Sequence, residues 1–90
     1  MSRAAPWSVH LDPRAAKHLD RLPPRDSEAI RVALRALAVD PLAHPNAKRL
    51  RGHAYGWRLR VRDYRVLYDL DPVDRVIVVA DVLRRTSKTY

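Results

Sequence analysis

The 90-residue sequence contains no cysteine, which excludes disulfide bonds, thiolate metal sites and cysteine nucleophiles, and which is typical of a reducing, cytoplasmic setting. It also lacks any apolar run close to the roughly 18 residues that a membrane-spanning helix needs. The segment from Met1 to Pro6 has no apolar stretch of the kind that signal peptides carry. We therefore expect one domain over residues 1–90, located in the cytoplasm and without membrane contact.

Several familiar catalytic signatures are missing as well. The sequence has no Walker loop and no Gly-x-Gly-x-x-Gly, and its serines lack the context of a nucleophile elbow. The four histidines do not have metal-ligand spacing and are interpreted as surface residues, and no carboxylate cluster predicts a magnesium site. The sequence therefore predicts neither a metal ion nor a cofactor.

Positive charge is plentiful and unevenly distributed. Residues 1–47 contain seven Lys/Arg and five Asp/Glu, a net charge of +2, whereas residues 48–90 contain eleven and five, a net charge of +6. A membrane-surface protein would carry such charge on a basic amphipathic helix, but here it lies on sequence that alternates like a strand. Nucleic acid is therefore the favoured partner.

The segment Trp57–Tyr68, WRLRVRDYRVLY, indicates a β-hairpin. If Arg62-Asp63 is a two-residue turn, Arg60 lies directly across from Arg65. The period of two then places Arg58, Arg60 and Arg65 on one face, and the apolar and aromatic residues on the other. Like charges in such a pair cost about 0.2–1 kcal/mol, which a polyanionic ligand would offset. The alternative is that these arginines are solvated surface or form ion pairs, with the following acids as candidates: Asp63, Asp69 and Asp81.

The remaining elements follow from periodicity and from proline. We expect a strand near Trp7–Leu11, a helix that starts after Asp12, a second helix between Pro24 and Asp40, and a last strand at Val76–Val82. Leu42–Gly56 has no clear period and is interpreted as a basic loop. The predicted fold is α+β with the order β-α-α-β-β-β: a helical hairpin packed on one face of a small, mainly antiparallel four-stranded sheet, with the other face open.

A set of ordered motifs covers nearly the whole chain. They are Val9-His10-Leu11-Asp12-Pro13, Leu22-Pro23, Asp40-Pro41, Lys48-Arg49-Leu50-Arg51-Gly52, Trp57-Arg58-Leu59-Arg60-Val61 and Asp63-Tyr64-Arg65-Val66-Leu67-Tyr68. In this order they resemble the RelE/ParE toxin superfamily of type II toxin–antitoxin systems. For the RelE-like branch, the resemblance implies a metal-independent endoribonuclease, or mRNA interferase, that cleaves mRNA on the ribosome and inhibits translation.

The resemblance also implies a set of site residues. By position, the catalytic residues would be Arg58, Arg60, Arg65, Arg85 and Tyr90, with Arg84 as the alternative to Arg85. They would act on the attack of the nucleotide's 2′-hydroxyl on the adjacent phosphate: Arg58 and Arg65 would stabilise charge, Arg60 would assist the 2′-hydroxyl and Arg85 the leaving group. Further basic residues are predicted to bind RNA: Lys48, Arg49, Arg51, Arg62, Arg84 and Lys88.

Two other functions remain open on the sequence. One is a ParE-like inhibitor of DNA gyrase, which belongs to the same superfamily without being an enzyme. The other is a basic nucleic-acid-binding module with no catalytic activity. For the RelE-like reading, the implied partners are a cognate antitoxin protein, in a toxin–antitoxin hetero-oligomer, together with the ribosome and mRNA.

Overall fold

The chain folds as two helices on a five-stranded mixed sheet, which confirms the predicted α+β class. The structure is a computed structural model that describes residues 5–52 and 55–85. In chain order its elements are β1 (Ser8–Leu11), α1 (Pro13–Asp20), α2 (Pro24–Val39), β2 (Ala47–Arg49), β3 (Trp57–Val61), β4 (Tyr64–Asp71) and β5 (Val76–Arg84).

Proline sets the start of both helices. Pro13 and Pro24 each occupy a first helical position, where the missing backbone N–H has no intrahelical acceptor and the fixed φ angle suits the helix. α2 ends at Val39, ahead of Pro41, whose ring disfavours helical geometry in the preceding residue. Among the described residues, neither helix has the length and apolar composition needed to cross a membrane.

The strand order is β1-β5-β4-β3-β2, with β1 parallel to β5 and the other neighbours antiparallel. The sheet therefore has one strand more than the four predicted. The additional strand is β2, which lies in the segment interpreted as a loop. It is only three residues long and forms because Ala47, Lys48 and Arg49 pair with Leu59, Arg58 and Trp57 of β3. That pairing is a tertiary contact and leaves no periodic signal in so short a segment.

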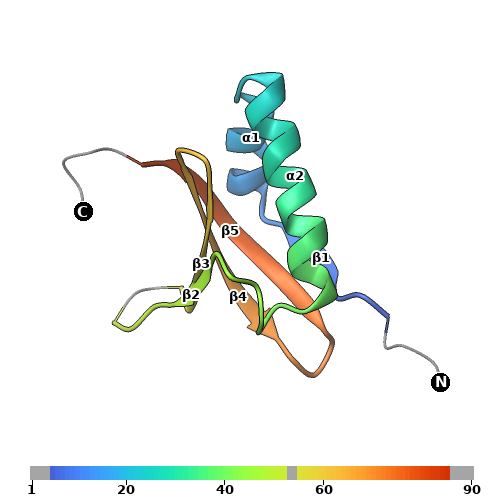
Figure 1. The fold of residues 1–90 in the computed structure, drawn as a ribbon. Helices are drawn as coiled ribbons and strands as arrows, with labels where there is room; N and C mark the ends of the chain where they lie inside the picture. The colour runs from blue at the N-terminus through green and yellow to red at the C-terminus, as the bar shows by residue number, and fades with distance from the viewer. Residues whose placement is uncertain (1–4, 53–54, 86–90) are drawn as a thin grey trace.

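Both helices lie on the same side of the sheet (Figure 1). The apolar stripe of α2 and the inward residues of the central strands form the core between them. Its largest fully buried side chains are Leu19, Ile30, Leu37, Leu59, Val66, Tyr68, Ile77 and Val79. Neither α1 nor α2 covers the opposite side of the sheet, which we call the open face. Lys48, Arg58, Arg60 and Arg65 lie on it.

β5 contains a bulge that changes which way its last residues point. Tyr68 of β4 pairs with Val79, but the next residue, Leu67, pairs with Asp81, so Ala80 is an extra residue without a partner of its own. A bulge of this kind reverses the alternation of faces beyond it. Arg84 therefore pairs with the core-facing Tyr64, and the following residue returns to the open face.

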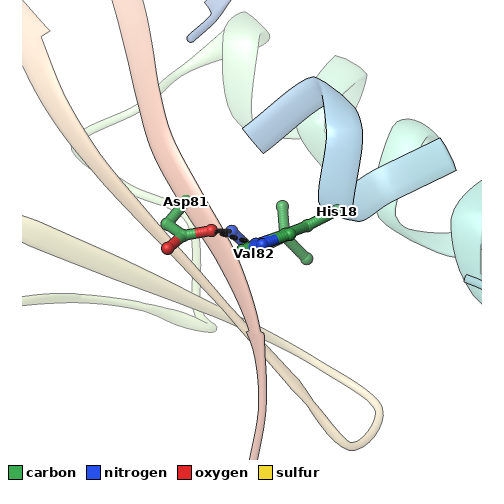
Figure 2. Close-up of polar contacts among 3 residues, drawn as sticks. All are labelled: His18, Asp81 and Val82. Atoms are coloured by element: carbon green, nitrogen blue, oxygen red, sulfur yellow. Dashed lines mark hydrogen bonds and ion pairs between the residues drawn. The ribbon is translucent and has the colours of Figure 1, made fainter. Parts of the chain in front are cut away.

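Asp81 is a buried charged residue that links β5 to α1. One of its carboxylate oxygens, Oδ1, accepts a hydrogen bond from the backbone N–H of Val82 at 2.8 Å and lies 2.6 Å from Nδ1 of His18 (Figure 2). An ionised carboxylate only accepts hydrogen bonds, so Nδ1 is the donor. The interpretation of His18 as a plain surface residue was therefore wrong, because its ring is half-buried and bonded across 63 positions of sequence.

The buried hydroxyl of Tyr68 predicts a stability change at high pH. It has no hydrogen-bond partner among the described residues, and burial raises its pKa from 10.0 to about 12, with Arg58 acting in the opposite direction. Between pH 10 and 12 the unfolded chain loses this proton and the folded chain keeps it, so stability falls as pH rises. Tyr68→Phe removes that loss.

At pH 8, we expect the free energy of unfolding of Tyr68→Phe to equal that of the parent or to exceed it by about 1 kcal/mol, because an unsatisfied buried hydroxyl is removed. Its advantage over the parent should grow by about 1.4 kcal/mol between pH 8 and pH 11. Urea unfolding of both proteins at pH 8 and pH 11 measures the two differences. An advantage that stays constant with pH would contradict the assignment.

Candidate nucleic-acid interface

The hairpin formed by β3 and β4, which we call the arginine hairpin, has the predicted register. β3 and β4 are joined at Arg62-Asp63, and Arg60 lies directly across from Arg65. Arg62 adopts a φ of +52°, which supplies the left-handed backbone that a tight two-residue connection needs. The alternation then places the side chains as predicted, because Leu59 and Val66 are fully buried whereas Arg60 is exposed on the other face.

Neighbouring strands extend the positive charge across the open face. Lys48 of β2 pairs with Arg58 of β3, and Arg60 pairs with Arg65 of β4, so two rows of cations run across adjacent strands. The backbone carbonyl of Asn46 accepts the N–H of Arg60 at 3.1 Å and lies 3.5 Å from Nη1 of Arg58. These contacts fix the chain that leads into β2 against the arginines of β3.

Arg58 is the centre of this cluster in electrostatic terms. Partial burial, followed by the positive charges of Arg60, Arg65 and Arg85, lowers its pKa from the ordinary value. The negative charge that Tyr68 acquires when its hydroxyl ionises, at high pH, acts in the opposite direction. An arginine nevertheless stays charged at neutral pH, so the cluster is held together against its own repulsion. A phosphate group would relieve that repulsion, since its oxygens match the donors of a guanidinium.

A hollow lies beside the cluster, with a volume of about 240 Å³. It is lined by Pro45, Asn46, Ala47, Lys48, Arg58 and Arg60. Three of these side chains are cationic. The hollow therefore offers a concave, positively charged surface directly next to the Arg60–Arg65 pair.

The structure distinguishes the two C-terminal arginines. Arg85 acts on the pKa of Arg58 and donates its backbone N–H to the carbonyl of Asp63 at 2.6 Å, so it lies by the hairpin turn and the cluster. Arg84 instead lies near Tyr64, which faces the helices, and its positive charge opposes the rise in the pKa of Tyr64. The β5 bulge brings Arg85 rather than Arg84 to the open-face arginines.

The other predicted site residues do not gather at one place. Arg49 pairs with Trp57 and shares its side of the sheet, and Arg51 lies in the bend after β2. Arg62 forms an ion pair with Asp26 of α2 at 3.2 Å. Tyr90 and Lys88 lie outside the described residues.

Two of the three acids considered as alternative partners of the arginines, Asp69 and Asp81, form other hydrogen bonds. Oδ1 of Asp69 accepts the backbone N–H of Gly56 at 2.6 Å, and the Asp81 carboxylate bonds to α1 as described above. Within residues 5–52 and 55–85, no group of three or more His, Asp or Glu side chains is placed to hold a metal ion.

Two residues of this region were missed in the sequence. Asn46 was assigned to a loop, yet its backbone carbonyl accepts a hydrogen bond from β3 and the residue lines the hollow. Asp26 was read only as a helix residue, yet its carboxylate accepts the hydroxyl of Tyr64 at 2.9 Å. That hydrogen bond, with burial and the Asp26 charge, raises the pKa of Tyr64, so the hydroxyl stays protonated and donates. Neither contact has a local signal, because the partners are 14 and 38 positions apart.

The chain is similar to known proteins in sequence and in structure. Residues 9–88 match the family described as the ParE toxin of the type II toxin–antitoxin system parDE. A putative toxin RelE1 of Methanocaldococcus jannaschii is 28% identical over 81 residues, which is 88% of this chain and 90% of that protein.

Two solved structures are similar over most of the chain. The toxin–antitoxin complex RelBE2 of Mycobacterium tuberculosis contains a chain that is 31% identical, with a TM-score of 0.77 and coverage of 90% of this chain and 100% of that one. The archaeal RelE–RelB complex of Pyrococcus horikoshii contains one with a TM-score of 0.78 and 23% identity, covering 92% and 99%, and this likeness concerns the fold alone. The match to the ParE toxin family spans residues 9–88 of 90. The chain therefore belongs to the RelE/ParE toxins of type II toxin–antitoxin systems.

Proposed function

We propose that this toxin is a metal-independent endoribonuclease that cleaves mRNA on the ribosome. The observation that carries the proposal is the convergence of Arg58, Arg60, Arg65 and Arg85 at the open face, beside a cationic hollow. Two like charges directly opposite each other, such as Arg60 and Arg65, cost about 0.2–1 kcal/mol, and a phosphate ligand would offset this repulsion. Relatives that carry the name RelE support the ribonuclease branch of the family.

The reaction that suits this arrangement is transfer of a phosphoryl group within the RNA. The 2′-oxygen of one nucleotide attacks the adjacent phosphorus, the bond to the 5′-oxygen of the next nucleotide breaks, and the products are a 2′,3′-cyclic phosphate and a 5′-hydroxyl. The nucleophile comes from the substrate, so the protein's task is to orient it and to stabilise the added negative charge. Arg58 and Arg65 would bind the phosphate oxygens, Arg60 would face the 2′-hydroxyl, and Arg85 would face the leaving oxygen.

The partner proposed for the toxin is a cognate antitoxin protein. Two solved relatives, RelBE2 of Mycobacterium tuberculosis and RelE–RelB of Pyrococcus horikoshii, are complexes of toxin and antitoxin. A net charge of +8 favours an acidic or amphipathic segment in that partner. Co-expression with the neighbouring gene should yield a complex that survives purification in high salt.

Inducible expression followed by mapping of RNA 5′ ends tests the proposed function. A ribonuclease of this kind stops translation and leaves new 5′-hydroxyl ends within translated mRNA. Inhibition of DNA gyrase, the other activity considered for the superfamily, would instead induce the DNA-damage response and leave mRNA intact. Growth arrest with intact mRNA would therefore contradict the ribonuclease proposal.

RNA binding by the isolated toxin should depend strongly on salt. Each phosphate contact on single-stranded RNA contributes a slope of about −0.7 to the plot of log affinity against log salt. Lys48 lines the hollow and pairs with Arg58, so Lys48→Ala should make the slope less steep by about 0.7, one contact's worth. Lys17→Ala, on α1, is the control with the same change in charge and should leave the slope unchanged. Equal slopes for the parent and Lys48→Ala would show that Lys48 does not contact a phosphate of the RNA.

A further inference from the structure

The carboxylate of Asp26 binds the arginine hairpin at two points. Asp26 lies in the first turn of α2. Its Oδ2 accepts a hydrogen bond from the hydroxyl of Tyr64 at 2.9 Å, and its Oδ1 accepts one from Nη1 of Arg62 at 3.2 Å. The two donors stand on either side of Asp63, one within the turn and one at the first position of β4. A single carboxylate thus holds both sides of the turn against a helix that is 38 residues earlier in the chain.

The turn that Asp26 holds has an unfavourable backbone. Arg62 has a φ of +52°, and a residue other than glycine in the left-handed region costs about 1–2 kcal/mol, so surrounding contacts must maintain it. The bond from Arg62 to Asp26 is one such contact on the helix side. On the other side, the carbonyl of Asp63 accepts the backbone N–H of Arg85. The turn is therefore fixed between the start of α2 and the end of β5.

The turn is adjacent to two of the proposed catalytic arginines. Arg60 and Arg65 form the pair next to the Val61–Tyr64 pair that closes the turn. A displacement of about 1 Å in a group that stabilises a transition state can cost roughly 100-fold in rate. We propose that Asp26 is a positioning residue of the ribonuclease: through Tyr64 and Arg62 it holds the Arg60–Arg65 pair in the geometry that the reaction requires, without touching the RNA. The inference rests on the proposed function.

Charge makes this role separable from a role in binding. Asp26→Asn keeps the size of the side chain and raises the net charge of the protein from +8 to +9. RNA affinity should therefore stay the same or increase, because the protein becomes more basic. The amide keeps an oxygen acceptor for one donor but no longer attracts Arg62 by charge. A role confined to electrostatic steering would predict tighter RNA binding with an unchanged cleavage rate at saturating enzyme, whereas a positioning role predicts slower cleavage.

The test compares Asp26→Asn with Asp20→Asn. Asp20 also pairs with an arginine, Arg31, at 3.3 Å, so the control removes one carboxylate and one ion pair on the helix side without affecting the hairpin. We expect Asp26→Asn to lower the single-turnover cleavage rate at saturating enzyme by about 10-fold or more, with RNA affinity unchanged or tighter. Asp20→Asn should cleave at the parent's rate.

Tyr64→Phe provides a second, independent variant, since it removes one donor and keeps the buried ring. It should also cleave more slowly while remaining folded. The double variant Asp26→Asn/Tyr64→Phe should lose much less than the product of the two single effects, because both act through one contact.

Several outcomes would overturn the inference. The first is an Asp26→Asn protein that cleaves at the parent's rate, and the second is a loss that Asp20→Asn shares. A third is a loss in Asp26→Asn and Tyr64→Phe that is fully accounted for by the fraction of unfolded protein at the assay temperature. If the parent itself does not cleave ribosome-bound mRNA, the proposed function fails, which is a different result from any of these.

Discussion

Replacing Arg65 with alanine is expected to lower the rate of mRNA cleavage by about 10²-fold to 10³-fold, the usual effect of removing one preorganised donor to a transition-state anion. Arg65 lies on β4, across from Arg60, and its charge contributes to lowering the pKa of Arg58. Removing Arg65 relieves the cross-strand repulsion, and this gain opposes the loss of its other contacts, so the free energy of unfolding should change by no more than about 1 kcal/mol. Toxicity on induction should fall in parallel with the cleavage rate.

Cleavage of ribosome-bound mRNA and the thermal midpoint are measured on the same Arg65→Ala protein. Arg14→Ala is the matched control, because it removes an exposed arginine from α1 and leaves the open face intact. An arginine that served folding alone would give the opposite pattern, with a lower thermal midpoint and activity in proportion to the folded protein. A destabilised Arg65→Ala that still cleaves at the parent's rate would remove Arg65 from the site.

The hairpin could be predicted from sequence because its information is local. A two-residue connection fixes the register, and the period of two then assigns every side chain between Trp57 and Tyr68 to a face. Proline marked the helices for the same reason. β2 could not be predicted, since a three-residue strand is defined only by its partner. The parallel pairing of β1 with β5 likewise joins segments about 68 residues apart, and nothing in Ser8–Leu11 indicates its orientation.

The candidate site was predictable in part. Arg58, Arg60 and Arg65 follow from the hairpin, and the structure places them together as expected. Simple alternation along β5 would place Arg84 with the open-face residues, but the extra residue Ala80 reverses the faces and brings Arg85 there instead. A bulge is detected only when both strands are seen.

The residues that support the site were the least predictable. Asp26 and His18 are helix residues that each form a hydrogen bond with a sheet residue far away in the sequence. Both hydrogen bonds depend on how the helices pack against the sheet. An isolated aspartate in the first turn of a helix is well explained by the helix dipole alone. The sequence therefore gives no reason to connect it with Tyr64, and only the packed structure reveals that the hairpin is hydrogen-bonded to α2.

A single 2′-deoxynucleotide at the cleavage position is expected to abolish cleavage of the mRNA. The proposed reaction takes its nucleophile from the substrate, so the loss of one oxygen atom removes the attacking group. The phosphates that are proposed to contact Lys48 and the arginines remain in place. Binding of the RNA should therefore be nearly unchanged. Mapping of 5′ ends identifies the position, and a synthetic mRNA with one deoxynucleotide there is then tested on the ribosome.

The matched control places the deoxynucleotide three positions upstream, where cleavage should proceed at the parent rate. The all-ribose product should carry a 5′-hydroxyl that a kinase can label directly, because the bond to the 5′-oxygen is the one that breaks. Persistent cleavage of the substituted mRNA, or product that can be labelled only after phosphatase treatment, would mean that water is the nucleophile. That result would leave the arginine cluster as a phosphate-binding site but would require a group that activates water, which arginines of high pKa are poorly suited to provide.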